Sequence, residues 1–402
     1  MPEVLRVSHD RLIYLYSSQT SGIHSKEQNY IAQDPNEEWY GDKHLYVYDR
    51  DSFDPNINAI PRFIAEYGLQ SYPAMVSLKT ITDIEEELVF GSDFLHQRDH
   101  HPNGDTEMVR LINFQFNIPK EGSPNYTNTI VYYSQVVDGW GMRISTEHYR
   151  KFRSMYTEDG KGHTMGALLW QLSDVWVGPS WAGIDSLGRW KVRQYMARHF
   201  FAPVIITGLI YSPRELSIYA VSDLLEETLK DLTVTVEVYE WTNFVPIGSF
   251  SKRVDVPPSQ TTTVKVFNID DFLVEVCGGD KDKVKNLCFL RLTMKDKNGK
   301  DVAPENFVFP GKIKDVWLET PDLKIIDVKD LGDNTFEITL KTDKICLFVW
   351  LESHDIRGLF SDNAFHMYTE TKSVTFRSNK PTTLEELKRV LTVTNIRNDE
   401  FK

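Results

Sequence analysis

The chain has 402 residues, of which 41% are apolar and 12% aromatic, and its formal net charge is −13. This length exceeds one compact domain of ordinary size, so we expect two or three domains. The acidic balance, without basic runs among the aromatics, argues against nucleic-acid binding. No stretch approaches the ~20 apolar residues of a membrane helix, and the first residues lack a signal-peptide pattern, which predicts no secretory address for this chain.

Up to Pro203, short apolar runs alternate with helical patterns. The run at residues 62–66 points apolar side chains to both faces, as a buried parallel strand does. This alternation predicts an α/β unit with a parallel sheet over residues 1–203. The predicted strands lie at 12–16, 45–48, 62–66 and 166–170, and the predicted helices at 145–155 and 190–200.

After Pro203 the sequence consists of short alternating runs at close spacing, which is typical of β-sandwiches. We expect one sandwich over residues 204–312 and a second over 313–402. The predicted strands of the first lie at 210–212, 216–221, 232–239, 261–266 and 288–292, and those of the second at 323–328, 335–340, 347–351 and 373–376.

Three cysteines are present, and Cys277 and Cys288 are close in sequence. They could form a disulfide, although two buried free thiols are at least as compatible with the pattern. No spacing of metal ligands is present, and we predict no metal and no cofactor.

Glu66 is the strongest candidate for chemistry, because it ends a buried strand and Gly68 then turns the chain. Functional side chains of parallel α/β folds lie at the carboxyl ends of strands. A carboxylate there is either catalytic or a structural acid in an ion pair, and position alone favours the structural interpretation.

The segment that begins with Trp170 ends another predicted strand. Its indole could stack on a sugar ring while Gln171 and Asp174 receive sugar hydroxyls. On the pattern alone, a tryptophan that closes the core and an aspartate that caps a turn are the better interpretation.

Two other polar groups stand out. Asp42 and His44 lie beside Tyr46 near the start of a strand. Residues 95–102 contain three histidines, but histidines so close together cannot easily aim at one ion, so a solvated or sugar-contacting loop is the better interpretation. The chain has no nucleophile elbow, P-loop or dinucleotide fingerprint, which leaves carboxylate chemistry as its enzymatic possibility.

Several stretches resemble the β-mannosidases of the family-two glycoside hydrolases, in their animal lysosomal form. The Glu-Tyr-Gly-x-Gln-Ser and Trp-Gln-Leu-x-Asp motifs are specific, and the similarity runs in order along essentially the whole chain. The stretches that carry it lie at 62–71, 162–172, 179–182, 199–203, 348–351 and 360–365.

This resemblance implies that residues 1–203 form the second half of a (β/α)₈ barrel, followed by two immunoglobulin-like sandwiches. It makes Glu66 the nucleophile at the end of the seventh barrel strand. The implied reaction is retaining removal of terminal β-mannose from oligosaccharides in lysosomal N-glycan breakdown. The expected substrate contacts are Trp170, Gln171, Asp42, His44, Tyr46, Tyr67 and Trp181.

The resemblance also has a departure. In this family the acid/base glutamate follows an asparagine at the end of the fourth strand, and Asn36-Glu37 does not match that position. We therefore expect a truncated chain that needs the missing N-terminal half as a partner. Two alternatives are an inactive sugar-binding protein and a family-two enzyme of other specificity, such as β-galactosidase or exo-glucosaminidase; Gln70-Ser71 favours mannosidase.

Overall fold

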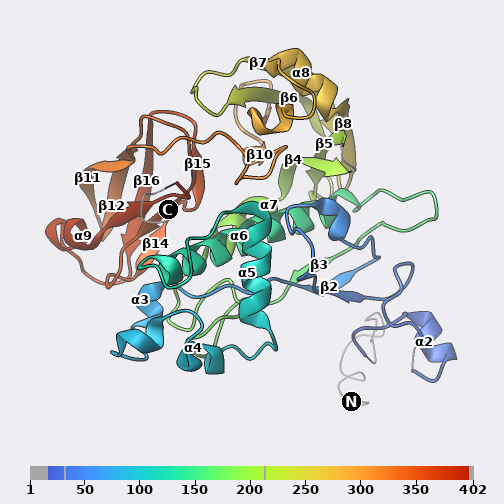
Figure 1. The fold of residues 1–402 in the computed structure, drawn as a ribbon. Coiled ribbons are helices and arrows are strands. Elements are labelled where there is room, and N and C mark those ends of the chain that lie inside the picture. Colours follow the sequence, from blue (N-terminus) through green and yellow to red (C-terminus); the bar gives the residue numbers. More distant parts are fainter. Residues whose placement is uncertain (1–16, 31–32, 212–213, 398–402) are drawn as a thin grey trace.

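The computed structural model describes residues 17–30, 33–211 and 214–397, so the strand predicted at 12–16 lies outside the described residues. The first part of the chain is an α/β unit with one parallel sheet (Figure 1). Its elements are α2 Ile23–Glu27, β1 Lys43–Leu45, β2 Ile64–Tyr67, α3 Met75–Leu78, α4 Asp93–Arg98, α5 Gly104–Gln115, α6 Tyr126–Lys151, β3 Ala167–Leu169 and α7 Val192–Phe200.

The sheet has the order β1-β2-β3, and both pairings are parallel. This confirms the predicted parallel sheet for the three runs that fall in the described residues. Strand β1 is Lys43–Leu45, whereas the prediction placed the strand at residues 45–48. The register explains the difference, because Leu45 pairs with Tyr67, the last residue of β2, and no pairing continues beyond it.

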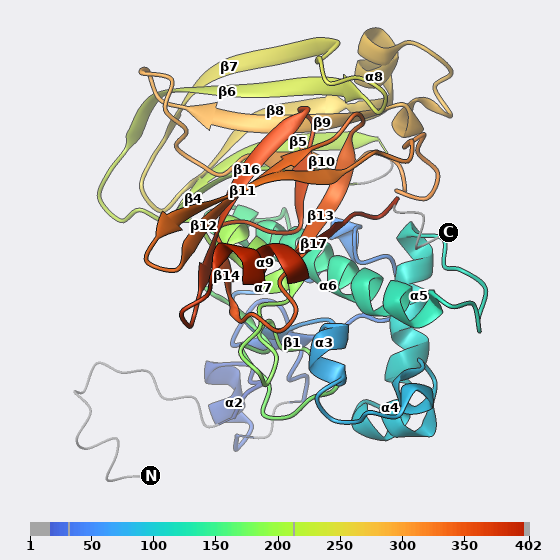
Figure 2. The ribbon, with the colours of Figure 1, turned by 90° about the vertical axis from the view of Figure 1, so that its left-hand side faces the viewer.

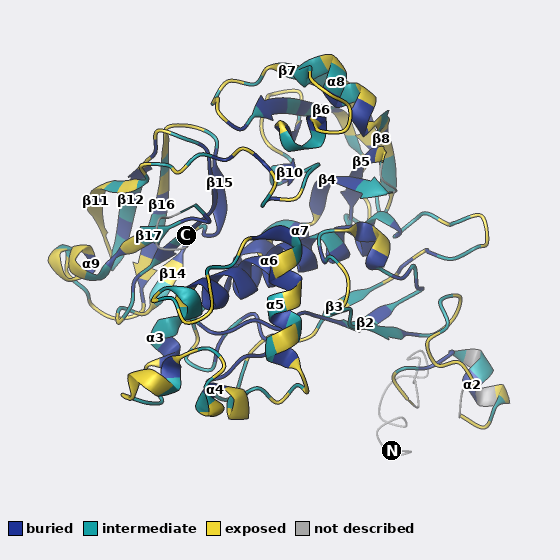
Figure 3. Cartoon of the chain, in the orientation of Figure 1, coloured by how far each residue is buried: buried dark blue, intermediate teal, exposed yellow. Residues whose placement is uncertain are grey.

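Helix α6 is much longer than the predicted helix at 145–155, since it begins at Tyr126 and ends at Lys151. Most of the helix is buried, as the dark blue ribbon in Figure 3 shows. A helix that is covered on all sides has no polar stripe, so the part of α6 before residue 145, about five turns, lacks the periodic pattern that reveals a surface helix.

Residues from Val204 onward form a first antiparallel sandwich, with sheets ordered β4-β5-β8 and β10-β9-β6-β7. Cys277, at the end of helix α8, is disulfide-bonded to Cys288, at the start of β9. The elements are β4 Val204–Tyr211, β5 Glu215–Ser222, β6 Leu229–Glu240, β7 Gly248–Val256, β8 Thr261–Asn268, α8 Ile269–Cys277, β9 Cys288–Lys295 and β10 Asn306–Val308.

A second antiparallel sandwich follows, with sheets ordered β11-β12-β16-β14 and β15-β13-β17. Its inward residues form a separate apolar core around Phe336, Ile338 and Phe376. The elements are β11 Lys324–Gly332, β12 Thr335–Lys341, β13 Cys346–Glu352, β14 Gly358–Phe360, β15 Phe365–Met367, β16 Thr371–Ser378, α9 Leu384–Val390 and β17 Thr392–Thr394.

All three parts meet around α6, which passes beneath both sandwiches (Figure 2). One apolar cluster joins Trp140 of α6 to Phe309, which follows β10, and to Phe348 of β13. The ring of Trp140 stacks on Phe309 at 4.9 Å and meets Phe348 edge-on at 5.4 Å. The helix thereby fixes the α/β unit against the sandwiches. None of the helices in the described ranges is long and apolar enough to cross a membrane.

Candidate active site

Glu66 lies near the carboxyl end of β2, where two side chains from β1 and its extension reach its carboxylate. The hydroxyl of Tyr46 donates to Oε2 at 2.9 Å. Nδ1 of His44 lies 3.4 Å from the same oxygen, and the Glu66 side chain keeps 31% of its surface exposed. The carboxylate is therefore oriented by two neighbours yet open to a ligand.

Tyr46 remains a hydrogen-bond donor, because its pKa is raised, first by burial and then by its hydrogen bond to Glu66. A phenol beside a carboxylate keeps its proton, since ionising it would place two negative charges together. Tyr46, predicted as a substrate contact, thus lies against the carboxylate of Glu66.

His44 and Asp42 are joined through Ser18. The hydroxyl of Ser18 contacts Nε2 of His44 at 2.9 Å and donates to Oδ2 of Asp42. Asp42 is only 4% exposed. Asp42 therefore holds His44 in place through Ser18. The predicted contact between Asp42 and a sugar is not supported, because the Asp42 side chain is buried.

Tyr67 does not lie with the other predicted sugar contacts. Its side chain is 2% exposed and its hydroxyl lies 2.7 Å from Oγ1 of Thr146 in α6. Because successive strand residues point to opposite faces, Tyr67 enters the core while Glu66 faces the opening. The predicted substrate contact for Tyr67 is not supported by this placement.

The loop after β3 forms the neighbouring rim. Trp170 is 42% exposed, and its backbone N–H donates to the Tyr67 carbonyl at 3.0 Å, next to the end of β2. Gly68 packs against this loop so closely that a Cβ would lie 2.3 Å from the Trp170 carbonyl oxygen, so only glycine fits. The side chain of Gln171 donates to Asp174 at 3.5 Å.

Buried charges hold this rim from below. Arg193 of α7 donates to the main-chain carbonyls of Trp170 at 3.2 Å and Gln171 at 2.9 Å, and also to that of Trp181. Its counter-charge is Asp138 of α6, 3.4 Å away, and both side chains are almost completely buried. A guanidinium with several donors in a fixed fork suits this role, because it satisfies several carbonyls at once.

Lys191 supports the loop after β2 in the same way. Its ammonium donates to the carbonyls of Ser71 at 2.9 Å and Ser180 at 3.3 Å, and burial lowers its pKa to about 8. The sequence did not predict a role for Arg193, Lys191 or Asp138, because the residues that they contact are distant in sequence and no local pattern marks them.

An aromatic group lies beside Glu66. Trp181 meets Tyr46 edge-on at 6.3 Å and donates from Nε1 to the hydroxyl of Tyr48 at 2.7 Å. Tyr48 was not predicted as a site residue, although its spacing of two from Tyr46 would place both on one side of an extended segment. His101 also packs against Trp181, with ring centroids 5.3 Å apart.

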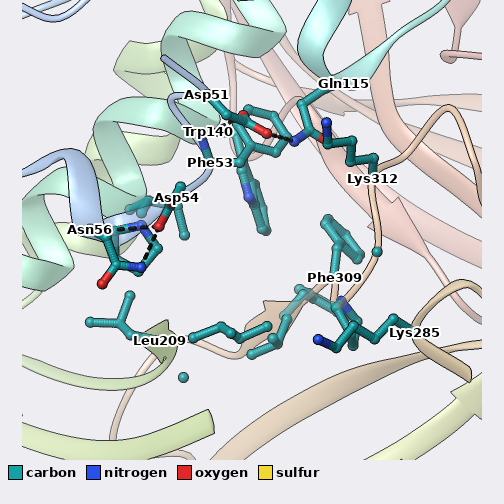
Figure 4. A pocket seen from close by; sticks show the side chains of 18 residues that line it. Asp51, Phe53, Asp54, Asn56, Gln115, Trp140, Leu209, Lys285, Phe309 and Lys312 are labelled. Carbon is teal, nitrogen blue, oxygen red and sulfur yellow. Dashed lines mark hydrogen bonds between the residues drawn. The ribbon is translucent and has the colours of Figure 1, made fainter. Parts of the chain in front are cut away.

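A separate cavity of about 450 Å³ lies between α6 and the first sandwich, and Glu66 is not among its lining residues (Figure 4). Two of its polar pairs are internal, since Gln115 donates to Asp51 at 2.7 Å and Asn56 donates to Asp54 at 2.6 Å. It is therefore distinct from the carboxylate site. Within the described ranges no cluster of metal-ligating side chains is found.

Comparisons with known domain families cover the two sandwiches. Residues 214–315 match the mannosidase Ig/CBM-like domain, and residues 318–399 match an Ig-fold domain of mannosidases. The predicted immunoglobulin-like character of both sandwiches is thereby confirmed.

Solved structures show the fold of the whole. The chain superposes on the β-D-mannosidase of Dictyoglomus thermophilum with a TM-score of 0.76 at 23% identity, covering 98% of this chain and 44% of that one. An exo-chitosanase from Amycolatopsis orientalis gives a TM-score of 0.60 at 15% identity, covering 89% and 44%. Both likenesses show that this chain shares its fold with part of those two enzymes.

Curated relatives match nearly the whole chain. The β-mannosidase of Mus musculus is 32% identical over 95% of this chain, and the probable β-mannosidase of Caenorhabditis elegans is 27% identical over 96%. The chain spans 42% and 43% of those proteins. The similarity to β-mannosidases thus runs along nearly the whole chain, which confirms the resemblance predicted from the motif around Glu66.

Proposed function

We propose that this chain supplies the nucleophile of a retaining β-mannosidase, with Glu66 attacking the anomeric carbon of a terminal β-mannose. The observation that carries the proposal is the open, oriented carboxylate of Glu66, to which Tyr46 donates at 2.9 Å. In such enzymes one carboxylate forms a covalent glycosyl ester while a second carboxyl group, roughly 5–5.5 Å away, protonates the leaving oxygen.

The proposal includes the architecture around the site. We take β1, β2 and β3 as three adjacent strands of a (β/α)₈ barrel whose other strands lie in the part of the relatives that this chain does not span. The apolar side chains near β3 support this, since Met165, Leu168 and Leu172 are each more than half exposed. Parallel strands are normally covered on both faces, so this surface fits a missing barrel wall.

The domain division that follows is residues 1–203 for the barrel segment, then 204–312 and 313–402 for the two sandwiches. The partner is the N-terminal half of the enzyme, which would close the barrel and bring the acid/base carboxylate. The proposed substrate is an oligosaccharide with a terminal β-mannose, degraded with N-glycans in the lysosome; the sugar contacts would come from Trp170, Gln171 and Trp181, with His44 and Tyr46 at the nucleophile.

The test uses a fluorinated β-mannosyl fluoride. Attack by a Glu66 oxygen on C1 forms the glycosyl ester and breaks the C1–F bond, and fluoride departs without needing a proton. We expect mass spectrometry of the intact chain and its peptides to find one mannosyl adduct on Glu66 and none in Glu66→Gln. A chain that stays unlabelled, or is labelled equally in the variant, contradicts the proposal.

Specificity and acid catalysis are tested separately. The corresponding galactosyl reagent should label Glu66 more slowly than the mannosyl reagent, and the reverse order would favour a β-galactosidase. The chain alone should cleave aryl β-mannosides with poor leaving groups only when the N-terminal half of a relative is added. Efficient cleavage by the chain alone would show that its acid lies within the 402 residues.

A further inference from the structure

A histidine outside the predicted site contacts the aromatic group beside Glu66. His101 lies in the loop between α4 and α5, and its ring centroid is 4.9 Å from that of Tyr48 and 5.3 Å from that of Trp181. These are the residues that carry the aromatic surface outward from Tyr46. The loop thus places the imidazole of His101 against the rings of Tyr48 and Trp181.

The orientation of His101 is fixed on one side. Its Nε2 lies 2.6 Å from Oε2 of Glu107, in the first turn of α5, and its backbone N–H donates to Oδ1 of Asp99 at 3.1 Å. The same Asp99 oxygen accepts from Gln70, just beyond β2, at 2.9 Å. The loop is therefore tied both to its own helix and to the segment that carries Glu66.

In the neutral ring, a carboxylate on Nε2 favours the tautomer with its proton there, which leaves Nδ1 as an acceptor. Within the described part of the chain Nδ1 has no hydrogen-bond partner, and the His101 side chain keeps 21% of its surface exposed. Sugar hydroxyls can donate hydrogen bonds, and the apolar faces of sugar rings stack on aromatic side chains. The free nitrogen beside Trp181 and Tyr48 is suited to accept from such a hydroxyl.

We infer that His101, oriented by Glu107, is a specificity residue that accepts a hydrogen bond from a hydroxyl of the carbohydrate lying against Trp181 and Tyr48. This inference rests on the proposed function, since it assumes that a sugar binds at Glu66. It extends the site to the loop of residues 99–103, which follows α4.

The test replaces His101→Phe, which keeps an aromatic ring against Trp181 but removes the acceptor. The probes are methyl β-mannoside and β-1,4-mannobiose, with dissociation constants for the 402-residue chain measured by calorimetry. We expect affinity to fall by roughly 3- to 10-fold, the effect of one net hydrogen bond. His101→Asn, which restores a side-chain acceptor, should recover part of it.

His96→Phe is the matched control, because His96 pairs with Asp105 in the same region but its side chain is 64% exposed. It should leave both dissociation constants unchanged, and the melting temperatures should show that all variants fold. A loss with both sugars assigns the contact to the terminal mannose, and a loss with mannobiose alone assigns it to the second sugar.

Three results would overturn the inference: unchanged affinities in His101→Phe, an equal loss in His96→Phe, or no binding of either sugar to the unaltered chain. Failure of the proposed function is seen elsewhere, as the absence of an adduct on Glu66. If Glu66 is labelled and both dissociation constants are unchanged in His101→Phe, the proposed function stands and only the inference falls.

Discussion

At the scale of single residues, the hydroxyl of Tyr46 most directly determines how Glu66 presents its carboxylate. Tyr46→Phe removes the 2.9 Å donation and leaves the ring in place. A hydrogen bond to a charged group contributes about 1.5–3 kcal/mol, so labelling of Glu66 at saturating reagent should slow by roughly 10- to 100-fold.

The control is Tyr48→Phe, measured by the same time course of adduct formation. Tyr48 accepts from Trp181 and has no hydrogen bond to Glu66, so its loss should change the labelling rate far less. Equal rates in Tyr46→Phe and the unaltered chain would show that the hydroxyl does not orient Glu66.

His148 gives a prediction about pH. It lies buried in α6, with Nδ1 2.9 Å from the hydroxyl of Tyr211 in β4 and Nε2 3.0 Å from the Ala59 carbonyl, and burial lowers its pKa from 6.5 to about 3. Between these two values the unfolded chain binds the proton and the folded chain does not, so stability must fall as the pH drops below 6.5.

At pH 5 this effect is on the order of 2 kcal/mol, since one pKa unit corresponds to about 1.4 kcal/mol. We expect the urea midpoint of His148→Gln to fall less steeply between pH 7 and pH 5 than that of the unaltered chain. Parallel midpoint curves would show that His148 protonates in the folded state, and that the contacts to Tyr211 and Ala59 tolerate the charge.

At the scale of elements, Arg193 connects α7 to the loop after β3 and to α6. Arg193→Met removes the side-chain donor from three carbonyls, of which those of Gln171 and Trp181 keep a backbone N–H donor, and leaves Asp138 buried without its counter-charge. Removal of one partner from a buried pair costs about 3–5 kcal/mol, so we expect a loss of that size in urea unfolding.

Arg193→Lys keeps the charge and should lose less. Arg198→Met on the same helix removes an exposed side chain that donates to the Ser361 carbonyl at 2.7 Å, and should change the free energy of unfolding by less than about 1 kcal/mol. Similar losses in Arg193→Met and Arg198→Met would mean that Asp138 is not charged in the folded protein.

The extent to which these elements were predictable depends on how local their signals are. The alternating strands of the sandwiches and the strand that contains Glu66 can each be recognised from a few consecutive residues. The resemblance of the motif around Glu66 to β-mannosidases is equally local. Lys191, by contrast, acts on a carbonyl 120 residues away, and nothing in its neighbours indicates this. His101 was seen as part of a histidine-rich loop, but only the fold brings it to Trp181.

At the scale of the whole molecule, the second sandwich acts as a support for α6. Tyr133 of the helix donates to the Ile396 carbonyl at 3.0 Å, and Tyr132 donates to the Phe348 carbonyl. Removing residues 318–402 would expose Trp140 and both tyrosines, and burial of each large side chain contributes about 1.5–3 kcal/mol.

We therefore expect a chain of residues 1–317 to lose the cooperative unfolding transition of the full chain, as followed by circular dichroism on heating. A chain of residues 204–317, which keeps the separate core of the first sandwich, should retain a transition of its own. A sharp transition of residues 1–317 near the melting temperature of the full chain would show that α6 is stable without its C-terminal contacts.

The bond between Tyr133 and Ile396 joins residues 263 positions apart, and this separation has a meaning for synthesis on the ribosome. At about 5–20 residues per second, the segment that completes the surroundings of α6 emerges roughly 13 to 50 seconds after the helix itself. During that interval the apolar face of α6 is accessible to chaperones. If translation stopped before the C-terminal segment was made, that face would stay exposed.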